Sequence, residues 1–191
     1  EDFLIWMLTS KHAVRYLDVP IQHTDPVVLE RMNRRPAIEA SRAAAEVLRA
    51  VIPDVTLRTT IMTGFPGETE ARFKAMMADL RRMQFDRLGA FAYSPEEGTK
   101  GAKLKGRPSR AVAEAREKAV MDQAKALWKV KAKRLLGRTF RALVVAPGVA
   151  RMASQAPDVD GVTYVDSDAV GEFVTVKLVK ARGFDFIGEL A

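Results

Sequence analysis

The sequence contains no cysteine and only two histidines among its 191 residues. Without cysteine the chain forms no disulfide, no thiolate metal site, no iron–sulfur ligation and no thiol nucleophile. The two histidines, His12 and His23, are too few for a histidine-rich metal site. We therefore expect no metal ligand in this chain.

Long hydrophobic runs are also missing. No stretch of about 18 apolar residues occurs, so we expect no membrane-spanning helix and a cytoplasmic protein. Residues 3–8 are apolar, but acidic residues precede them and no small-residue cleavage site follows, which argues against a secretory signal. The chain begins with Glu1 and not with Met, so we expect a processed product, a truncated piece or a fragment of a longer chain.

Negative charge is scarce in the middle of the chain. Residues 100–141 contain 14 Lys and Arg against 3 Asp and Glu, a net +11, whereas 1–99 carry −1 and 142–191 carry −3. Such a charge run is usually the solvated face of a long helix, and contact with RNA is the alternative. Only Trp128 and Phe140 interleave with it, so stacking on single-stranded RNA has little support.

The first hundred residues alternate short β-like runs with helical ones. This repeating β-loop-α pattern predicts an α/β fold with a parallel sheet and crossover helices. Three strands bury little surface and leave open edges, so either the outer strands find partners elsewhere or half of the domain is missing from this chain. The predicted strands are 15–19, 56–63 and 88–93, and the predicted helices are 26–32, 38–51 and 68–83.

The pattern changes after residue 98. The segment 98–108 is rich in Gly and Lys and predicts a linker, and Ser109 predicts the N-cap of a helix that ends near Leu135. From Arg138 the hydrophobic period becomes two, and four or five short strands predict a small OB-like barrel. The predicted parts are a β/α part at 1–106, a basic connecting helix at 107–135 and a β-barrel at 136–191.

The most specific local motif is RTTIMTGFPGET at 58–69, which places two glycines between a predicted strand and a helix. In α/β folds ligands bind at the carboxyl ends of strands, and glycine lets a flat ligand approach the backbone. A plain strand-to-helix turn, with Glu68 at the helix N-terminus, is the alternative. No GK[ST] follows, so the motif is not a phosphate-binding loop.

Four further blocks accompany this motif: YLDVPIQH at 16–23, LERMNRR at 29–35, FDRLGAFAYSPEEGT at 85–99 and APDVDG at 156–161. In this order they resemble the methylthiotransferase branch of the radical S-adenosylmethionine (SAM) enzymes, and within it the RimO-type enzymes. The resemblance covers nearly the whole chain. It implies that 1–106 is the second half of a radical SAM β/α barrel, with about three β/α units, and that 136–191 is an OB-like TRAM barrel.

The resemblance also implies a SAM pocket. Gln22 would reach the ribose or the amino-acid portion of SAM, and Met62 would face the adenine. Arg58 would pair with the SAM carboxylate, which suits its guanidinium. The structural alternatives are a loop hydrogen bond for Gln22 and an ion pair for Arg58. The turn that would let the adenine approach comprises Gly64, Phe65, Pro66 and Gly67.

Other residues become candidates for substrate contact. His23 lies at the same rim, with a loop-orienting hydrogen bond as its alternative. Tyr93 ends the third predicted strand and Glu97 comes shortly after it. For both residues the structural alternative is a turn whose hydrogen bonds are satisfied. Asp158 and Asp160 belong to an acidic cluster in the C-terminal barrel.

The family requires SAM and two four-iron four-sulfur (4Fe–4S) clusters, and a CxxxCxxC loop holds the cluster that cleaves SAM. Because this chain has no cysteine, the resemblance implies that the loop lies before Glu1 and that this chain ligates neither cluster. We therefore expect no turnover by the chain alone and assign no catalytic residue in it. Thr60 and Gly67 stand where the superfamily pattern GxIxGxxE has Gly and Glu, so the match is to the branch more than to the superfamily.

The RimO-type resemblance implies methylthio transfer to the β-carbon of an aspartate in ribosomal protein S twelve. MiaB-type relatives modify tRNA and carry YSPRPGT where this chain has YSPEEGT at 93–99. An acidic barrel suits a basic ribosomal protein better than tRNA, because phosphate contacts need Lys and Arg. Contact of 100–141 with ribosomal RNA stays open, and we expect a monomer. A tRNA-modifying fragment and a non-catalytic binding module remain the alternatives.

Overall fold

The computed structural model describes residues 2–34 and 38–191, which form two compact units. The β/α unit comprises Leu17–Pro53 and Leu57–Ala124, and the barrel unit comprises the residues up to Tyr16, Asp54–Thr56 and Lys125–Ala191. Arg35, the last residue of the LERMNRR block, lies outside the described residues. The domain boundaries that we predict at 106 and 136 stay a prediction.

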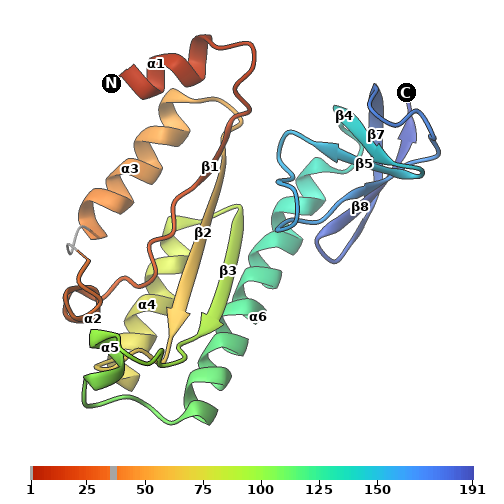
Figure 1. The fold of residues 1–191 in the computed structure, drawn as a ribbon. Helices are drawn as coiled ribbons and strands as arrows, with labels where there is room; N and C mark the ends of the chain where they lie inside the picture. The colour runs from red at the N-terminus through yellow and green to blue at the C-terminus, as the bar shows by residue number, and fades with distance from the viewer. Residues whose placement is uncertain (1, 35–37) are drawn as a thin grey trace. The chain divides into compact units, whose positions relative to one another are not determined.

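A three-stranded sheet with the order β1-β2-β3 organises the first half of the chain (Figure 1). Strands β2 and β3 pair in parallel, with Thr60 opposite Gly89. The β-branched residues of β2 favour extended backbone, and burial alternates along the strand as expected for a sheet with two different faces. The predicted α/β fold is confirmed. The strands are β1 (Tyr16–Asp18), β2 (Thr56–Thr63) and β3 (Arg87–Ala92).

Local capping signals determine where the helices begin and end. The Asp25 carboxylate accepts hydrogen bonds from the amides of Val27 and Val28 and so caps the helix that begins at Pro26. The Thr69 hydroxyl caps the helix Glu70–Met83, and Gln84 ends this helix in the left-handed conformation. The helices are α2 (Pro26–Arg31), α3 (Ile38–Val51), α4 (Glu70–Met83), α5 (Lys100–Lys103) and α6 (Arg110–Leu135).

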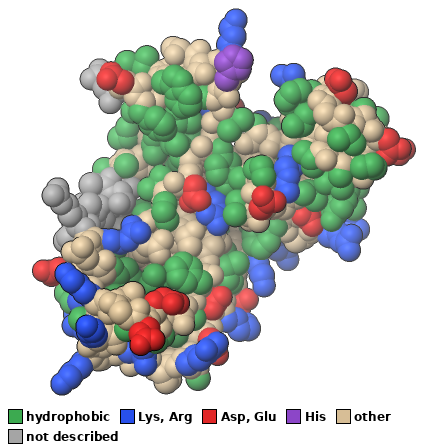
Figure 2. Space-filling model, viewed as in Figure 1, with side chains coloured by type: hydrophobic (Ala, Val, Ile, Leu, Met, Phe, Trp, Pro, Cys, Tyr) green, Lys and Arg blue, Asp and Glu red, His purple; other side chains and the backbone are tan. Residues whose placement is uncertain are grey.

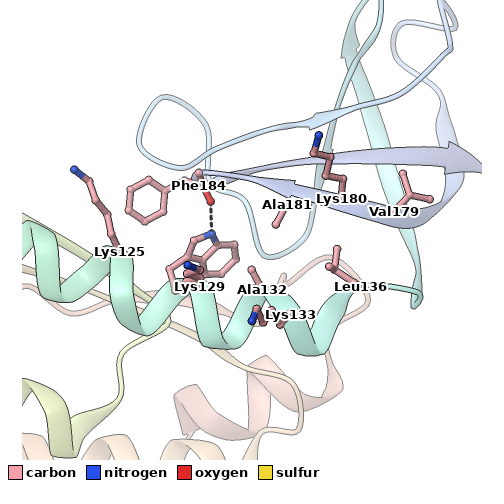
Figure 3. Close-up of a pocket in the computed structure, with 11 residues that line it drawn as sticks. Lys125, Lys129, Ala132, Lys133, Leu136, Val179, Lys180, Ala181 and Phe184 are labelled. Atoms are coloured by element: carbon pink, nitrogen blue, oxygen red, sulfur yellow. Dashed lines mark hydrogen bonds between the residues drawn. The ribbon is translucent and has the colours of Figure 1, made fainter.

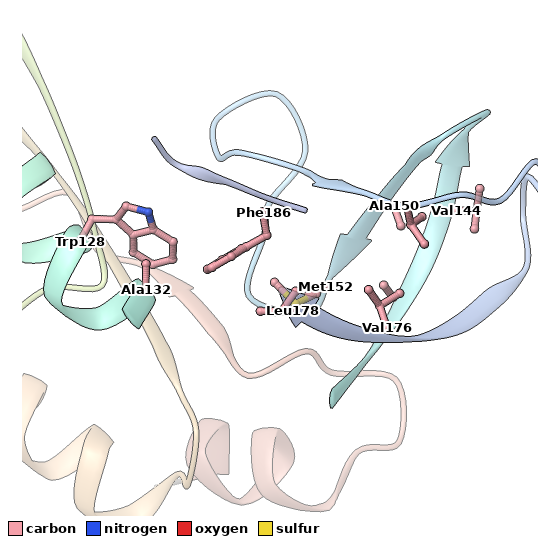
Figure 4. Close-up of a cluster of buried hydrophobic side chains, with 10 residues drawn as sticks. Trp128, Ala132, Val144, Ala150, Met152, Val176, Leu178 and Phe186 are labelled. Atoms are coloured by element: carbon pink, nitrogen blue, oxygen red, sulfur yellow. The ribbon is translucent and has the colours of Figure 1, made fainter. Parts of the chain in front are cut away.

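Five strands of the barrel unit close into a barrel with the order β4-β5-β6-β8-β7. Its core contains the fully buried Val144, Leu178 and Phe186, and Trp128 of α6 packs edge-on to Phe186 with 5.6 Å between ring centroids (Figure 4). The predicted small barrel is confirmed. The strands are β4 (Thr139–Ala146), β5 (Val149–Met152), β6 (Thr163–Tyr164), β7 (Phe173–Arg182) and β8 (Asp185–Leu190).

Two short helices add to the predicted elements. The apolar run near the N-terminus forms α1 (Asp2–Thr9), on which Phe3, Ile5 and Trp6 are exposed. Figure 2 shows a green area of hydrophobic side chains over α1. The predicted linker contains the single turn α5, because the Thr99 hydroxyl accepts a hydrogen bond from the amide of Ala102. In the described parts of the chain, no helix is both long and apolar enough to cross a membrane.

Candidate functional site

The carboxyl ends of the three parallel strands bring the predicted rim residues to one edge of the sheet. The backbone N–H of Gln22 donates to the backbone carbonyl of Thr60 at 2.9 Å. The backbone carbonyl of Gln22 accepts from the backbone N–H of Met62 at 2.8 Å. On the other side of β2, the Tyr93 amide donates to the Thr63 carbonyl at 2.8 Å. This edge is where ligands bind in α/β folds.

The Gly64–Gly67 turn lies at this edge and needs both glycines. Gly64 has φ +75°, and a Cβ there would lie 2.2 Å from the Cβ of Ala113. Gly67 has φ +100°, and a Cβ there would lie 2.8 Å from the Arg31 side chain, whose Nε donates to the Pro66 carbonyl at 2.9 Å. Gly64 therefore lies too close to α6 for any side chain, and at Gly67 the positive φ disfavours one.

Glu68 is the centre of a buried hydrogen-bond network, which we call the Glu68 network. Its Oε1 accepts from the Gly64 amide at 3.0 Å and from Arg116 Nη1 at 2.8 Å, and its Oε2 lies 3.2 Å from His23 Nε2. The side chains of Glu68 and His23 are fully buried. One carboxylate thus connects the loop after β1, the turn after β2 and helix α6.

His23 has a defined proton position in this network. The Asp25 amide donates to its Nδ1 at 2.9 Å, so Nδ1 carries no proton. The proton is therefore on Nε2, from which it is donated to Glu68. This geometry favours the loop-orienting role of His23.

Arg116 brings a second carboxylate into the network. Its Nη2 donates to Glu70 Oε2 at 3.1 Å, and its guanidinium lies 5.2 Å from the centre of the Phe73 ring. The hydrogen bond from Arg116 lowers the pKa of Glu70 below its ordinary value. A lowered carboxyl pKa contributes stability above the unfolded-state pKa that is lost as pH falls through the folded-state pKa. Because Glu70 is exposed, solvent screens this contribution.

Strand β2 has one buried face, with Thr59, Ile61 and Thr63. Its other face carries Arg58, Thr60 and Met62, which are partly exposed. The parallel register sets Met62 beside Phe91 of β3, and Phe91 is 41% exposed. Arg58 forms an ion pair with Asp18. Because Arg58 and Met62 are four residues apart, they share the face at a separation of about 13 Å.

Tyr93 and Phe65 meet edge to face at the same rim, with 4.8 Å between ring centroids. The Tyr93 hydroxyl is buried and has no hydrogen-bond partner among the described residues. Tyr93 also lines a cavity of about 400 Å³ beside the first turn of α6. Glu97 is exposed in the loop that follows.

The predicted acidic contacts lie in the barrel unit. Asp158 is exposed, with φ +63°. The Asp160 carboxylate accepts hydrogen bonds from the amide of Ala156 at 3.0 Å and from the hydroxyl of Tyr16 at 2.6 Å. Asp158 therefore offers a free carboxylate to solvent, whereas Asp160 also orders its own loop.

Two family models match parts of the chain: the Radical SAM superfamily over residues 7–80 and the TRAM domain over residues 136–191. A protein of Desulfitobacterium hafniense named "Ribosomal protein uS12 methylthiotransferase RimO" is 38% identical over 198 residues, which is 100% of this chain and 44% of the relative. The chain is homologous to RimO methylthiotransferases over a radical SAM segment and a TRAM domain.

A second RimO methylthiotransferase, from Burkholderia mallei, is 40% identical over 190 residues, or 94% of this chain and 41% of the relative. The chain thus spans less than half the length of these relatives. The solved structure of coproporphyrinogen III oxidase (HemN) from Escherichia coli, a radical SAM enzyme, superposes with a TM-score of 0.54 at 16% identity, covering 94% of this chain and 44% of that one. At this identity the likeness shows the fold alone.

The open face near the carboxyl edge fits the SAM of this superfamily in one respect. Met62 and the exposed Phe91 form an apolar surface of the kind that an adenine ring covers, and the backbone of Gln22 adjoins it. The described residues contain no group of three or more His, Asp or Glu that could hold a metal. The sequence contains no cysteine, so this chain supplies no cysteine ligand to a 4Fe–4S cluster.

The Glu68 network contains two residues that the sequence did not reveal, Arg116 and Glu70. Arg116 lies 48 residues from Glu68 and looks like any other basic residue of a charged helix. Its Nε is buried without a partner among the described residues, which fits a position inside the unit. The one sequence feature that could have indicated its burial is that Arg116 lies three residues after Ala113 and four before Val120, on the face of α6 that carries these buried apolar residues.

Proposed function

We propose that the chain is part of a radical SAM methylthiotransferase that transfers a methylthio group to the β-carbon of an aspartate in ribosomal protein S twelve. One observation carries this proposal: identity of about 40% to proteins named for this activity extends over 94% or more of the chain. The YSPEEGT block at 93–99 supports the same substrate over tRNA. The protein would act in the cytoplasm as a monomer.

In this proposal the chain contributes one wall of the SAM pocket. Met62 and the Gly64–Gly67 turn hold the adenine, Gln22 binds the ribose or the amino-acid portion, and Arg58 binds the carboxylate. When bound in the whole enzyme, a 4Fe–4S cluster supplies the electron that cleaves SAM, and its ligands come from outside this chain. The Glu68 network keeps the two loops of this wall at a constant distance from each other.

The substrate contacts proposed for the chain lie on its acidic and rim residues. Asp158 and Asp160 attract a basic ribosomal protein by charge complementarity, which acts mainly on the association rate. Tyr93 and Glu97 contact the substrate at the rim, and His23 orients the loop after β1 at the same edge of the sheet.

Ribosomal RNA next to the substrate is a further partner in this proposal. Within 100–141, Arg110 and Lys118 pair with acidic residues of the same helix. The exposed cations of the segment before α6 are Lys100, Lys103, Lys105 and Arg107. This segment follows the rim loop and is the part that we assign to RNA contact.

Mass spectrometry of ribosomal protein S twelve tests the proposed function. In a strain that lacks the gene, the methylthio modification should be absent, and the intact enzyme reconstituted anaerobically with iron, sulfide and SAM should restore it. An unchanged mass in the deletion strain would contradict the proposal. Modification of tRNA in its place would support the MiaB-type activity.

The SAM contact of Arg58 makes a second prediction. In the intact enzyme, Arg58→Ala should weaken SAM binding by about 1–3 kcal/mol, the range for losing a charged hydrogen-bond partner. Isothermal titration with SAM measures the effect. Asp18→Asn is the control, because it removes the ion pair of Arg58 but leaves the guanidinium in place. If Arg58→Ala leaves SAM affinity unchanged, the ion pair with Asp18 is its whole role.

A further inference from the structure

A groove in the barrel unit has no part in the function proposed above. Helix α6 and the β7–β8 hairpin enclose a cavity of about 490 Å³ (Figure 3). Its volume lies within the roughly 300–1,000 Å³ that is usual for binding clefts. The floor is apolar and consists of Trp128, Ala132, Leu136, Val179, Ala181 and Phe184.

Lysines form the rim of this groove. Lys125, Lys129 and Lys133 follow one another at four-residue spacing along α6, and Lys180 of β7 also lines the groove, with its amino group directed away from α6 (Figure 3). All four are exposed. Among the described residues, no carboxylate pairs with Lys129, Lys133 or Lys180.

The sequence around Lys129 and Lys133 contains no acidic residue. No Asp or Glu occurs between Asp122 and Asp158, whereas eight Lys and Arg do. By contrast, Lys118 lies about two turns before Lys125 on α6 and pairs with Asp122. The groove therefore combines an apolar floor with a rim on which Lys129 and Lys133 have no carboxylate partner among the described residues, so a complementary ligand has an apolar face and acidic edges.

The floor favours a protein over an RNA strand. The indole N–H of Trp128 donates to the Gly183 carbonyl at 2.8 Å, so it is not available to a base. Trp128 itself is buried, and Phe184 is the one partly exposed ring of the floor, whereas single-stranded RNA binds on successive aromatic platforms. An aliphatic surface would also leave the polar edges of bases unpaired.

We propose that this groove binds an amphipathic helix of a partner protein, with the apolar face of the helix on the floor and acidic residues beside the lysines. Helix-in-groove recognition uses anchors at i, i+3, i+4 and i+7. The lysines on α6 recur every four residues, so acidic residues with the same spacing on a helix that runs along α6 meet them in register. This partner differs from the basic substrate, which the lysine rim repels.

Fluorescence anisotropy with a labelled synthetic peptide of about four helical turns tests the proposal. The peptide carries Leu at the anchor positions and Glu on both flanks. It should bind the 191-residue chain, and Lys129→Gln with Lys133→Gln should weaken binding about tenfold, as expected for two lost rim charge pairs. The matched control is Lys74→Gln with Lys118→Gln, which removes the same charge from exposed lysines outside the groove and should leave the affinity unchanged.

The contribution of the floor is tested separately. Val179→Asn places a polar group on a side chain that is 41% exposed and should weaken peptide binding several-fold while the thermal unfolding midpoint stays the same. Three outcomes would overturn the proposal: equal binding of a scrambled peptide of the same composition, no effect of the lysine substitutions, or lysine-dependent binding of labelled oligouridylate without binding of the peptide.

Discussion

Replacing Glu68 by alanine is expected to destabilise the β/α unit by about 3–5 kcal/mol, the usual cost of removing one partner from a buried ion pair. The substitution would leave the charge of Arg116 buried without its carboxylate at 2.8 Å. The Gly64 amide and His23 Nε2 would lose their acceptor as well. Urea unfolding followed by far-UV circular dichroism measures the change.

Glu70→Ala is the matched control for this experiment. Glu70 binds the same guanidinium at 3.1 Å, but its side chain is 63% exposed. An exposed ion pair contributes about 0–1 kcal/mol, so the stability of this variant should remain close to that of the unsubstituted chain. Glu68→Gln keeps the shape of the side chain and should lower the free energy of unfolding by less than Glu68→Ala does. Equal effects of Glu68→Ala and Glu70→Ala would contradict the central role of Glu68.

Phe186→Ala is expected to destabilise the barrel unit by about 3–5 kcal/mol, as large-to-small substitutions of buried aromatic residues do. Phe186 is fully buried and packs on Trp128, Leu178 and Val176 in the core of the barrel. The chain has two tryptophans, and Trp128 is the buried one, so tryptophan fluorescence during urea unfolding follows this core.

A second phenylalanine of the same barrel supplies the control. Phe173 is 55% exposed, and its ring lies 3.7 Å from the guanidinium carbon of Arg141. Phe173→Ala removes only this exposed contact and should cost about 1 kcal/mol or less. If Phe173→Ala destabilises the barrel as much as Phe186→Ala, the buried cluster is not what stabilises the barrel.

Local chemistry made most of the elements predictable. Asp25 followed by Pro26 determines where α2 begins, and Ser109 precedes α6 at its N-terminus. These signals act between residues a few positions apart, so they are readable in the sequence. The single turn α5 was not predicted, because a helix of four residues covers only about one period of 3.6 and shows no repeat of a hydrophobic pattern.

The site was predictable only in part. The TGFPGE motif indicated the turn after β2, and the positive φ values of Gly64 and Gly67 confirm that glycine is needed there. The motif did not reveal what holds the turn. Arg116 and His23 reach Glu68 from 48 and 45 residues away, and no periodicity reports a contact between such distant positions.

The sequence by itself determined the absence of cysteine ligands, the alternation of strands and helices, and the concentration of positive charge in 100–141. These are properties of composition and of neighbouring residues. Only the tertiary structure decided which charges are neutralised: Arg116 is paired inside the β/α unit, Arg58 is paired with Asp18, and Lys129 and Lys133 face a groove without a carboxylate. The physical reason is that Coulomb energies depend on distance and burial, and both arise only when remote segments pack together.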